Sequence, residues 1–387
     1  MTKIKGGVSL LLTIGMLFLL CACGAGSSSS SQGDASSASA VSDASQAAQT
    51  TEAASDDIDE MISNMTLEEK VGQMFYVACP DVSAEDWVES YHLGGFVLFG
   101  RDFEGKTAEE INANIAGYQA KAKIPLLIGV DEEGGTVVRI SDNPNLRESA
   151  FPSPKNVYAS GGWAAIESTE AEKADLLLSL GVNVNNAPVC DVTGNEESFI
   201  FDRSFSGDTQ QVSEFVTKTV TIYGEKKLGS VLKHFPGYGD NTDTHEDMSY
   251  DGKPIEEFRQ NDFPPFRAGV DSGADAIMVA HNITACMDAE MPASLSESVH
   301  KVIRDELHFD GVIMTDDLAM QAISKYTDAQ ASAVAAAKCG NDVLCCSDVE
   351  TQYPAVLAAV QSGDIPEEQI NASVKRILQW KKKLGLI

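Results

Sequence analysis

The sequence predicts an α/β protein that folds as a single catalytic (β/α)8 barrel of the TIM type. Three observations support this prediction. Eight short apolar segments of strand length alternate with helix-like patterns after residue 55. Glycine precedes several of these segments, as expected where a helix turns back into a strand. The roughly 330 residues that carry the alternation match the usual size of the fold. A doubly wound open sheet is the competing architecture, and the eightfold repeat favours the barrel.

Each predicted element follows from its local pattern. The predicted strands are short apolar runs bounded by turn-forming residues, which is typical of buried parallel strands. They are Phe75–Cys79, Phe96–Phe99, Leu126–Asp131, Val182–Val189, Ser230–Phe235, Asp275–Ala280, Val312–Thr315 and Asp342–Cys346. The predicted helices have apolar residues at helical spacing, and Thr66 with Glu69 has the pattern of a capping box. They are Asp56–Lys70, Ala108–Ala122, Glu167–Leu180, Thr209–Lys227, Glu256–Ser272, Ser296–Glu306, Thr327–Lys338 and Gln369–Lys383.

The first 55 residues have the pattern of an exported lipoprotein. Two lysines precede an apolar run of 13 residues, Val8–Leu20, which has the length of a signal-peptide core. The sequence Leu20-Cys21-Ala22-Cys23 follows and has the pattern of a lipobox, so we expect residues 1–22 to be removed and Cys23 to carry the lipid; an ordinary signal peptide is the alternative. Residues 23–55 are rich in Ser and Ala, and we expect a disordered tether that holds residues 56–387 outside the cell membrane. The expected location is extracytoplasmic and lipid-anchored.

Composition excludes some classes of partner. The chain has 28 basic and 58 acidic residues, a net charge of −30, so nucleic acid is not expected to bind. Six cysteines follow the leader region, and none forms a Cys-x-x-Cys pair that would indicate a metal site. Most lie in apolar runs, so buried free thiols are expected, although an exported protein leaves disulfides open. We expect a monomer that needs no metal or organic cofactor.

Charged and polar residues collect where the predicted strands end. Chemistry in a barrel takes place at the carboxyl ends of its strands, and a charge buried there costs free energy unless it is paired or used. Five strands contribute to this group, which is hard to explain by packing. The residues are Asp131, Glu132, Glu133, Arg139, Asp191, Asp202, Arg203, Lys233, His234, Asp243, His245, His281, Asn282, Asp316 and Asp317.

The segment Lys233–His245, Lys-His-Phe-Pro-Gly-Tyr-Gly-Asp-Asn-Thr-Asp-Thr-His, resembles the signature of glycoside hydrolase family 3. The resemblance is strongest to the single-domain β-N-acetylhexosaminidases of that family. It continues at residues 311–320 and covers about residues 56–385. The chain differs from the pattern in two places, because the spacer before Asp243 is one residue shorter and Tyr238 occupies a position where His is common.

The two motifs supply candidate catalytic residues. Asp316 stands at the tip of a predicted strand, and the resemblance implies that it is the nucleophile; an ion-paired structural Asp is the alternative. His245 is the candidate general acid/base, with Asp243 as its partner, because a carboxylate fixes an imidazole's tautomer and raises its basicity. The resemblance implies a two-step retaining hydrolysis through a glycosyl–Asp316 ester. We also expect the loop that carries His245 to move during the cycle.

A second group is expected to hold the sugar. Carboxylates and guanidinium groups bind sugar hydroxyls through charge-assisted hydrogen bonds. The resemblance assigns contacts with a terminal N-acetylglucosamine to five positions: Asp131, Arg139, Arg203, Lys233 and His234. Asp191 and Glu133 are either supports for this group or purely structural. For His281 and Asn282, a supporting or structural role is favoured over catalysis.

The sequence therefore predicts a retaining exo-β-N-acetylglucosaminidase that acts on peptidoglycan fragments or chitin-type oligosaccharides. A β-glucosidase or β-xylosidase of the same family is the alternative among hydrolases. A phosphorolytic enzyme also stays open, because His repels phosphate less than a Glu acid would. The alternatives from other classes are a sugar-binding transport lipoprotein and a barrel that binds wall glycan without cutting it.

Overall fold

The computed structural model describes residues 57–387 of the chain. The predicted signal peptide (1–22), the lipidated Cys23 and the tether over residues 23–55 lie outside the described residues and stay predictions. Within residues 57–387, no helix combines the length and the apolar character that a membrane span requires.

Eight parallel strands form the centre of the fold. Their spatial order is β10-β1-β2-β3-β4-β5-β7-β9, so neighbours in sequence are neighbours in space. Each predicted strand is present, with ends that differ by a few residues. The strands are β1 (Phe75–Ala78), β2 (Gly95–Leu98), β3 (Leu127–Val130), β4 (Val184–Asn185), β5 (Gly229–Phe235), β7 (Ala276–Val279), β9 (Val312–Thr315) and β10 (Leu344–Cys346).

The ring of strands is closed. β1 pairs with β10, and the residue before β10 pairs with β9. There the Val343 N–H donates to the Ile313 carbonyl at 3.1 Å, and the Thr315 N–H donates to the Val343 carbonyl at 3.1 Å. These bonds leave no sheet edge, so the barrel prediction is confirmed and the open sheet is wrong.

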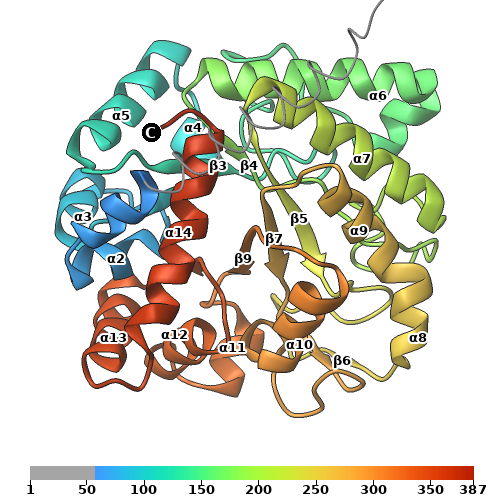
Figure 1. The fold of residues 1–387 in the computed structure, drawn as a ribbon. Helices are drawn as coiled ribbons and strands as arrows, with labels where there is room; N and C mark the ends of the chain where they lie inside the picture. The colour runs from blue at the N-terminus through green and yellow to red at the C-terminus, as the bar shows by residue number, and fades with distance from the viewer. Residues whose placement is uncertain (1–56) are drawn as a thin grey trace, which may run out of the picture. The chain divides into compact units, whose positions relative to one another are not determined.

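Helices enclose the strands (Figure 1). Each predicted helical stretch contains a helix, but residues 64–66 divide the stretch over 56–70 into a helix over 57–63 and α2. The Thr66–Glu69 capping box at the start of α2 is confirmed. The longest helix starts earlier than predicted and is broken at Gly161 and Gly162, so the prediction found only its second half. The helices are α2 (Leu67–Gln73), α3 (Ala84–Tyr91), α4 (Gly100–Phe103), α5 (Ala108–Lys121), α6 (Pro154–Ser179), α7 (Thr209–Lys226), α8 (Ile255–Glu257), α9 (Phe263–Asp271), α10 (Glu297–Lys301), α11 (Gln321–Tyr326), α12 (Ala329–Lys338), α13 (Val349–Gln361) and α14 (Glu367–Lys383).

Two short strands in the loops were not predicted. β6 (Tyr250–Asp251) and β8 (Ile283–Thr284) form a parallel pair outside the barrel. They join the loop after β5 to the loop after β7. Two residues per strand are too few for a sequence pattern to reveal.

One tyrosine ring lies buried among the barrel strands, next to two glycines. Tyr76 of β1 is buried, and a Cβ added at Gly129 of β3 would lie 1.3 Å from its hydroxyl oxygen. A Cβ at Gly95 of β2 would meet the same ring at 2.8 Å. The two glycines therefore make room for this ring. Its hydroxyl lies 3.4 Å from the amide oxygen of Asn186, which lines the cavity described below.

The six cysteines of the barrel are free thiols. Cys79, Cys190, Cys339 and Cys346 are buried, as expected from their apolar surroundings. Cys286, by contrast, is exposed. The prediction of buried free thiols is thus confirmed for these four.

The last helix packs against the first part of the barrel, and α14 runs beside α2 (Figure 1). Lys70 and Glu367 form an ion pair of 2.7 Å between the two helices. Lys381 is completely buried, and its ammonium nitrogen lies 2.7 Å from the amide oxygen of Gln73. Burial without a counter-charge lowers the pKa of Lys381 to about 7.

The buried lysine makes stability depend on pH in a predictable direction. In the unfolded chain the lysine pKa is about 10.4, so between about pH 7 and 10 unfolding takes up a proton. The unfavourable contribution of Lys381 should therefore shrink as pH rises through this window. We expect Lys381→Met to raise the free energy of unfolding by an amount on the order of 2 kcal/mol at pH 6.5, and by much less at pH 9.5.

Urea unfolding of both proteins at the two pH values checks this expectation. Lys338→Met is the matched control, because Lys338 is an exposed lysine paired with Asp364 on the surface. A Lys381→Met variant whose gain does not change with pH would contradict the expectation.

Candidate active site

A cavity of about 310 Å³ opens at the carboxyl ends of the barrel strands. Seven of the eight residues predicted to catalyse or to bind sugar line it. They are Asp131, Arg139, Arg203, Lys233, His234, His245 and Asp316. The eighth, Asp243, is hydrogen-bonded to His245. The structure therefore brings together residues that are as much as 185 positions apart in the chain (131 to 316).

Two consecutive residues of β5 face this cavity together. Side chains of a regular strand alternate between its two faces. The ladder between β5 and β7 shifts register between Leu232 and Phe235, and the Lys233–His234 peptide bond is cis. Lys233 and His234 both line the cavity.

Paired charges form one wall of the cavity. The Lys233 ammonium lies 2.6 Å from a carboxylate oxygen of Asp131 and 2.6 Å from one of Glu133. Arg203 binds both oxygens of Glu133, at 3.0 and 2.8 Å. Burial by itself would raise the pKa of Glu133, but the charges of Arg203 and Lys233 lower it well below the ordinary value. Glu133 is therefore an ionised bridge between two predicted sugar-binding cations.

His234 is held from both sides. Its Nε2 lies 3.0 Å from a guanidinium nitrogen of Arg203, which can only donate, so Nε2 accepts. Nδ1 therefore carries the proton and donates to Asp191 at 2.7 Å. Asp191 also accepts the backbone N–H groups of His234 and Tyr238. The structure gives Asp191 the supporting role that the sequence left open, and both ring nitrogens of His234 already have protein partners.

Arg139 is positioned by a residue that the sequence analysis did not assign. The fully buried Glu132 carboxylate accepts the backbone N–H groups of Arg139 and Ile140, each at 2.8 Å. This anchors the loop after β3. The Nε of Arg139 is buried and has no protein partner, so it is available to an acceptor in the cavity. The run Asp131-Glu132-Glu133 could have indicated a supporting role for Glu132. In the structure Asp131 and Glu133 line the cavity, and Glu132 between them does not.

Asp316 follows β9 on the opposite wall. Its backbone N–H donates to the Val279 carbonyl of β7 at 3.0 Å, and its carboxylate accepts the Asp317 N–H at 2.9 Å. Burial would raise the pKa of Asp316, but the surrounding imidazoles of His281, His234 and His245, which favour the carboxylate whenever they are protonated, and this N–H lower it below the ordinary value. The group is a carboxylate at neutral pH, as a nucleophile must be.

His281 supports this wall from behind through a contact with the backbone of Asp317. His281 is fully buried, and burial lowers its pKa, so its ring is neutral at pH 7. Nε2 lies 2.9 Å from the Asp317 carbonyl and must donate, while Nδ1 lies 2.7 Å from the Ser294 hydroxyl. This confirms a structural role for His281. Asn282 is fully buried and is not part of the cavity lining.

His245 lies on an exposed loop. Its Nδ1 is 2.8 Å from a carboxylate oxygen of Asp243, which also accepts the His245 backbone N–H at 2.9 Å. The His245 side chain is 59% exposed, whereas Asp316 is mostly enclosed. With Nδ1 bonded to Asp243, Nε2 is the nitrogen free to exchange a proton with a substrate.

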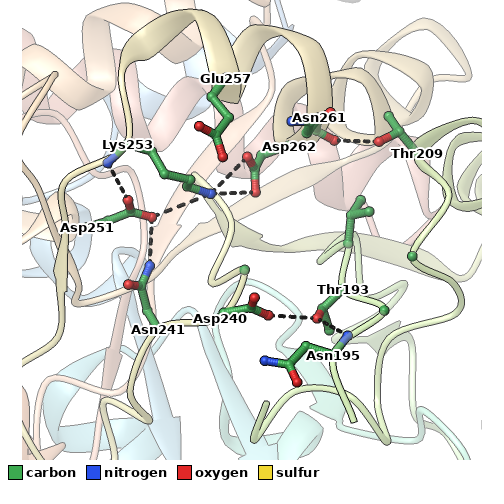
Figure 2. A pocket seen from close by; sticks show the side chains of 14 residues that line it. Thr193, Asn195, Thr209, Asp240, Asn241, Asp251, Lys253, Glu257, Asn261 and Asp262 are labelled. Atoms are coloured by element: carbon green, nitrogen blue, oxygen red, sulfur yellow. Dashed lines mark hydrogen bonds and ion pairs between the residues drawn. The ribbon is translucent and has the colours of Figure 1, made fainter. Parts of the chain in front are cut away.

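A second polar cavity, of about 480 Å³, borders the same loop. Figure 2 shows Asp251 and Asp262 on either side of Lys253, whose ammonium lies 3.0 Å from Asp262. Asp240 and Asn241 of the loop also line this cavity. Residues 239–241 therefore face one cavity and His245 the other. Within residues 57–387, no cluster of three or more His, Cys, Asp or Glu side chains is arranged to hold a metal ion.

The closed (β/α)8 barrel has a strand-end carboxylate and an Asp-paired imidazole beside one polar cavity at the carboxyl ends of its strands, which is where enzymes of this fold carry out their chemistry. The chain belongs to glycosyl hydrolase family 3, because the pattern of the glycosyl hydrolase family 3 N-terminal domain matches residues 66–380.

Comparison with known proteins gives the same family. The chain is 35% identical over 253 residues to a β-hexosaminidase of Xanthomonas campestris, which covers 64% of this chain and 75% of that protein. It is 33% identical over 321 residues to a β-hexosaminidase of Stenotrophomonas maltophilia, covering 80% and 89%. Among solved structures, a family 3 β-N-acetylglucosaminidase from a Paenibacillus species has a TM-score of 0.78 and 31% identity. That match covers 83% of this chain and 63% of the Paenibacillus chain.

The shared role of Glu133 gives a prediction for the cavity wall. Glu133→Gln removes the negative charge between two buried cations and should lower the free energy of unfolding by about 3–5 kcal/mol at pH 7. Because the pKa of Glu133 is lowered in the folded state, this difference should be complete above about pH 4.5 and should decline as pH falls below that value.

Urea unfolding at pH 7 and pH 4 measures the difference. Glu167→Gln is the control, since Glu167 is 51% exposed and pairs with Lys218 at 2.7 Å on the surface. That variant should lose at most about 1 kcal/mol. Equal losses in the two variants would contradict a buried ionic bridge.

Proposed function

We propose that this glycoside hydrolase is a retaining exo-β-N-acetylglucosaminidase that removes terminal N-acetylglucosamine through a covalent glycosyl–Asp316 intermediate. The observation that carries the proposal is the placement of Asp316 and the His245–Asp243 pair around one cavity. The printed names of the relatives support the substrate, because two are β-hexosaminidases and one is a β-N-acetylglucosaminidase. The natural substrates would be peptidoglycan fragments or chitin-type oligosaccharides.

In the first step the Asp316 carboxylate attacks the anomeric carbon. The bond from that carbon to the leaving oxygen breaks, and Nε2 of protonated His245 gives its proton to that oxygen. Asp243 holds Nδ1–H throughout and stabilises the imidazolium. The products of this step are a glycosyl ester of Asp316 and the free leaving alcohol.

In the second step neutral His245 acts as the base. It removes a proton from water while the water oxygen attacks the anomeric carbon, and the Asp316 carboxylate is released. Two displacements at one carbon retain its configuration. Each proton that His245 gives in the first step is recovered in the second, so no external acid is consumed.

The charged wall would hold the sugar. Asp131 and Lys233 form one ion pair at the cavity surface, and Arg203 and the unpaired Nε of Arg139 present donors beside it. Charged groups bind hydroxyl and amide groups more strongly than neutral groups do. Lys233 and Arg203 are already neutralised by Glu133 and Asp131, so the wall suits a neutral sugar better than an anion.

Kinetics with the purified protein test the proposal. We expect hydrolysis of nitrophenyl N-acetylglucosaminide with clear preference over the glucoside and xyloside. Asp316→Asn should lower kcat/KM by roughly 10⁴-fold or more, since the nucleophile is lost. A 5-fluoro glycoside should leave a sugar on the peptide that contains Asp316, detected by mass spectrometry.

Other outcomes would identify the alternatives. Preference for the glucoside or xyloside would make the chain a β-glucosidase or β-xylosidase of the family. Formation of a sugar phosphate on addition of inorganic phosphate would show phosphorolysis. Binding of the sugar with no turnover by the unaltered protein would contradict the enzymatic proposal.

We further propose that the enzyme is anchored outside the cell membrane by lipid on Cys23. The support is the leader pattern of residues 1–22 and the Ser- and Ala-rich segment that follows. Cys23→Ser should move the protein from the detergent phase to the aqueous phase of a detergent partition. Mass spectrometry should find lipid on the Cys23 peptide of the unaltered protein, and an unmodified Cys23 would contradict the anchor.

A further inference from the structure

Tyr238 lies near the start of the loop after β5, three residues beyond Phe235. It is 1% exposed and packs edge-on against Phe199, with ring centroids 5.0 Å apart. Its backbone N–H donates to Asp191 at 2.7 Å. Ile200 and Ala280 complete its apolar surroundings. The ring is therefore held by the body of the barrel rather than by the loop alone.

The hydroxyl of Tyr238 reaches the residue beside the candidate acid/base. It lies 2.5 Å from the hydroxyl of Thr244, which stands between Asp243 and His245. Thr244 is the one buried residue within 239–248, whereas His245 and Glu246 are exposed. The Thr244 carbonyl also accepts the Ala322 N–H of α11 at 3.2 Å. The exposed loop is thus pinned to the barrel at Thr244.

The loop has a further contact with α11. Lys325 donates to the Glu246 carbonyl at 3.0 Å and pairs with Asp247 at 2.9 Å. These groups are exposed, so the ion pair is a weak restraint. The buried contact between Tyr238 and Thr244 is the stronger one, because a buried hydroxyl without a partner is costly.

We propose that Tyr238 is a positioning residue for His245, holding the acid/base loop over the cavity through its hydrogen bond with Thr244. The inference rests on the proposed function and deepens it. A continuous set of contacts joins His234 to Asp191, Asp191 to Tyr238, and Tyr238 to Thr244. The sugar-binding wall and the acid/base are thereby kept in one arrangement by Asp191, Tyr238 and Thr244, which do not line the cavity.

The burial of Tyr238 suits this role and excludes another. Burial and then the charge of Asp316 raise the pKa of Tyr238 well above its ordinary value. The phenol therefore keeps its proton at neutral pH and remains a hydrogen-bonding group. It does not replace His245 as the acid.

Leaving groups separate positioning of the acid from general damage to the site. N,N′-diacetylchitobiose loses a sugar alcohol, which must be protonated as it leaves. A dinitrophenyl N-acetylglucosaminide loses a stable phenolate, which needs no proton. The value of kcat/KM reports the first step for both substrates, so the ratio of the two values measures acid catalysis.

We expect Tyr238→Phe to lower kcat/KM for N,N′-diacetylchitobiose by roughly tenfold, a part of the 10²–10⁴-fold that general acid catalysis provides. For the dinitrophenyl substrate the change should be less than about twofold. Thr244→Val should give the same pattern, and the double variant should be no worse than either single one, because both remove one contact. Thr244→Ser retains the hydroxyl and should keep the ratio of the unaltered protein.

Two further variants complete the experiment. His245→Ala should show the same selectivity to a larger extent. Tyr353→Phe is the matched control, because it also removes a tyrosine hydroxyl that is bonded to one group, the Glu68 carbonyl at 3.2 Å, between α13 and α2 and outside the cavity lining. Its ratio should not change.

Each result bears on a separate claim. Equal losses on both substrates in Tyr238→Phe and Thr244→Val, or no loss on either, would overturn the positioning role. If the unaltered protein hydrolysed neither substrate, or if His245→Ala showed no dependence on the leaving group, the proposed function would fail and this inference with it.

Discussion

The buried bridge that Glu133 makes between Lys233 and Arg203 is the interaction on which the mouth of the barrel depends. Each of these charges would be costly to bury alone, and each is acceptable because the others are present. The three residues come from three separate parts of the ring: the end of β3, the loop after β4 and the end of β5. Their pairing therefore fixes these three segments relative to one another. Arg203 also contacts His234 and so restrains its ring.

The two candidate catalytic groups are held in contrasting ways. Asp316 stands directly after a buried strand, and the N–H groups around it tie it to β7 and to Asp317. His245 stands on an exposed loop that is bound to the barrel through Thr244. The contrast fits the proposed chemistry, in which the nucleophile forms and then breaks a bond to a single carbon. The acid/base serves a leaving alcohol first and a water afterwards, and both must pass it.

Local pattern was sufficient for the eight strands of the barrel and for most helices. β9 was predicted to the residue, since Val312–Thr315 is a short apolar run between Gly311 and Asp316. β4 was predicted too long, because Pro188 has no N–H for the ladder and Asn186 belongs to the cavity. The helix predicted over 256–272 contains a π-helical turn at Phe258–Asp262, which depends on packing and has no sequence signal.

The sequence was enough to predict which residues belong to the candidate site, but not which hydrogen bonds and ion pairs they make. Strand-end position and the two motifs were enough to select residues that line one cavity. The roles of Glu132, Tyr238 and Thr244 were not predicted, because each depends on how its loop folds back on itself, and no residue pattern in these loops shows which side chains turn inward. When a Tyr and a Thr lie within a loop of turn-forming residues, the sequence does not show whether their side chains are buried and bonded or exposed.

What the sequence by itself determined is the alternation of eight strands with helices and the chemical groups at the strand ends, because apolar spacing and residue type act locally along the chain. What only the tertiary structure decided is which charges neutralise each other, that His245 keeps one ring nitrogen free while both nitrogens of His234 are bonded, and that Asp316 and His245 share one cavity. Those facts depend on closing the ring and on a register shift in β5, and both arise from contacts between segments far apart in the chain.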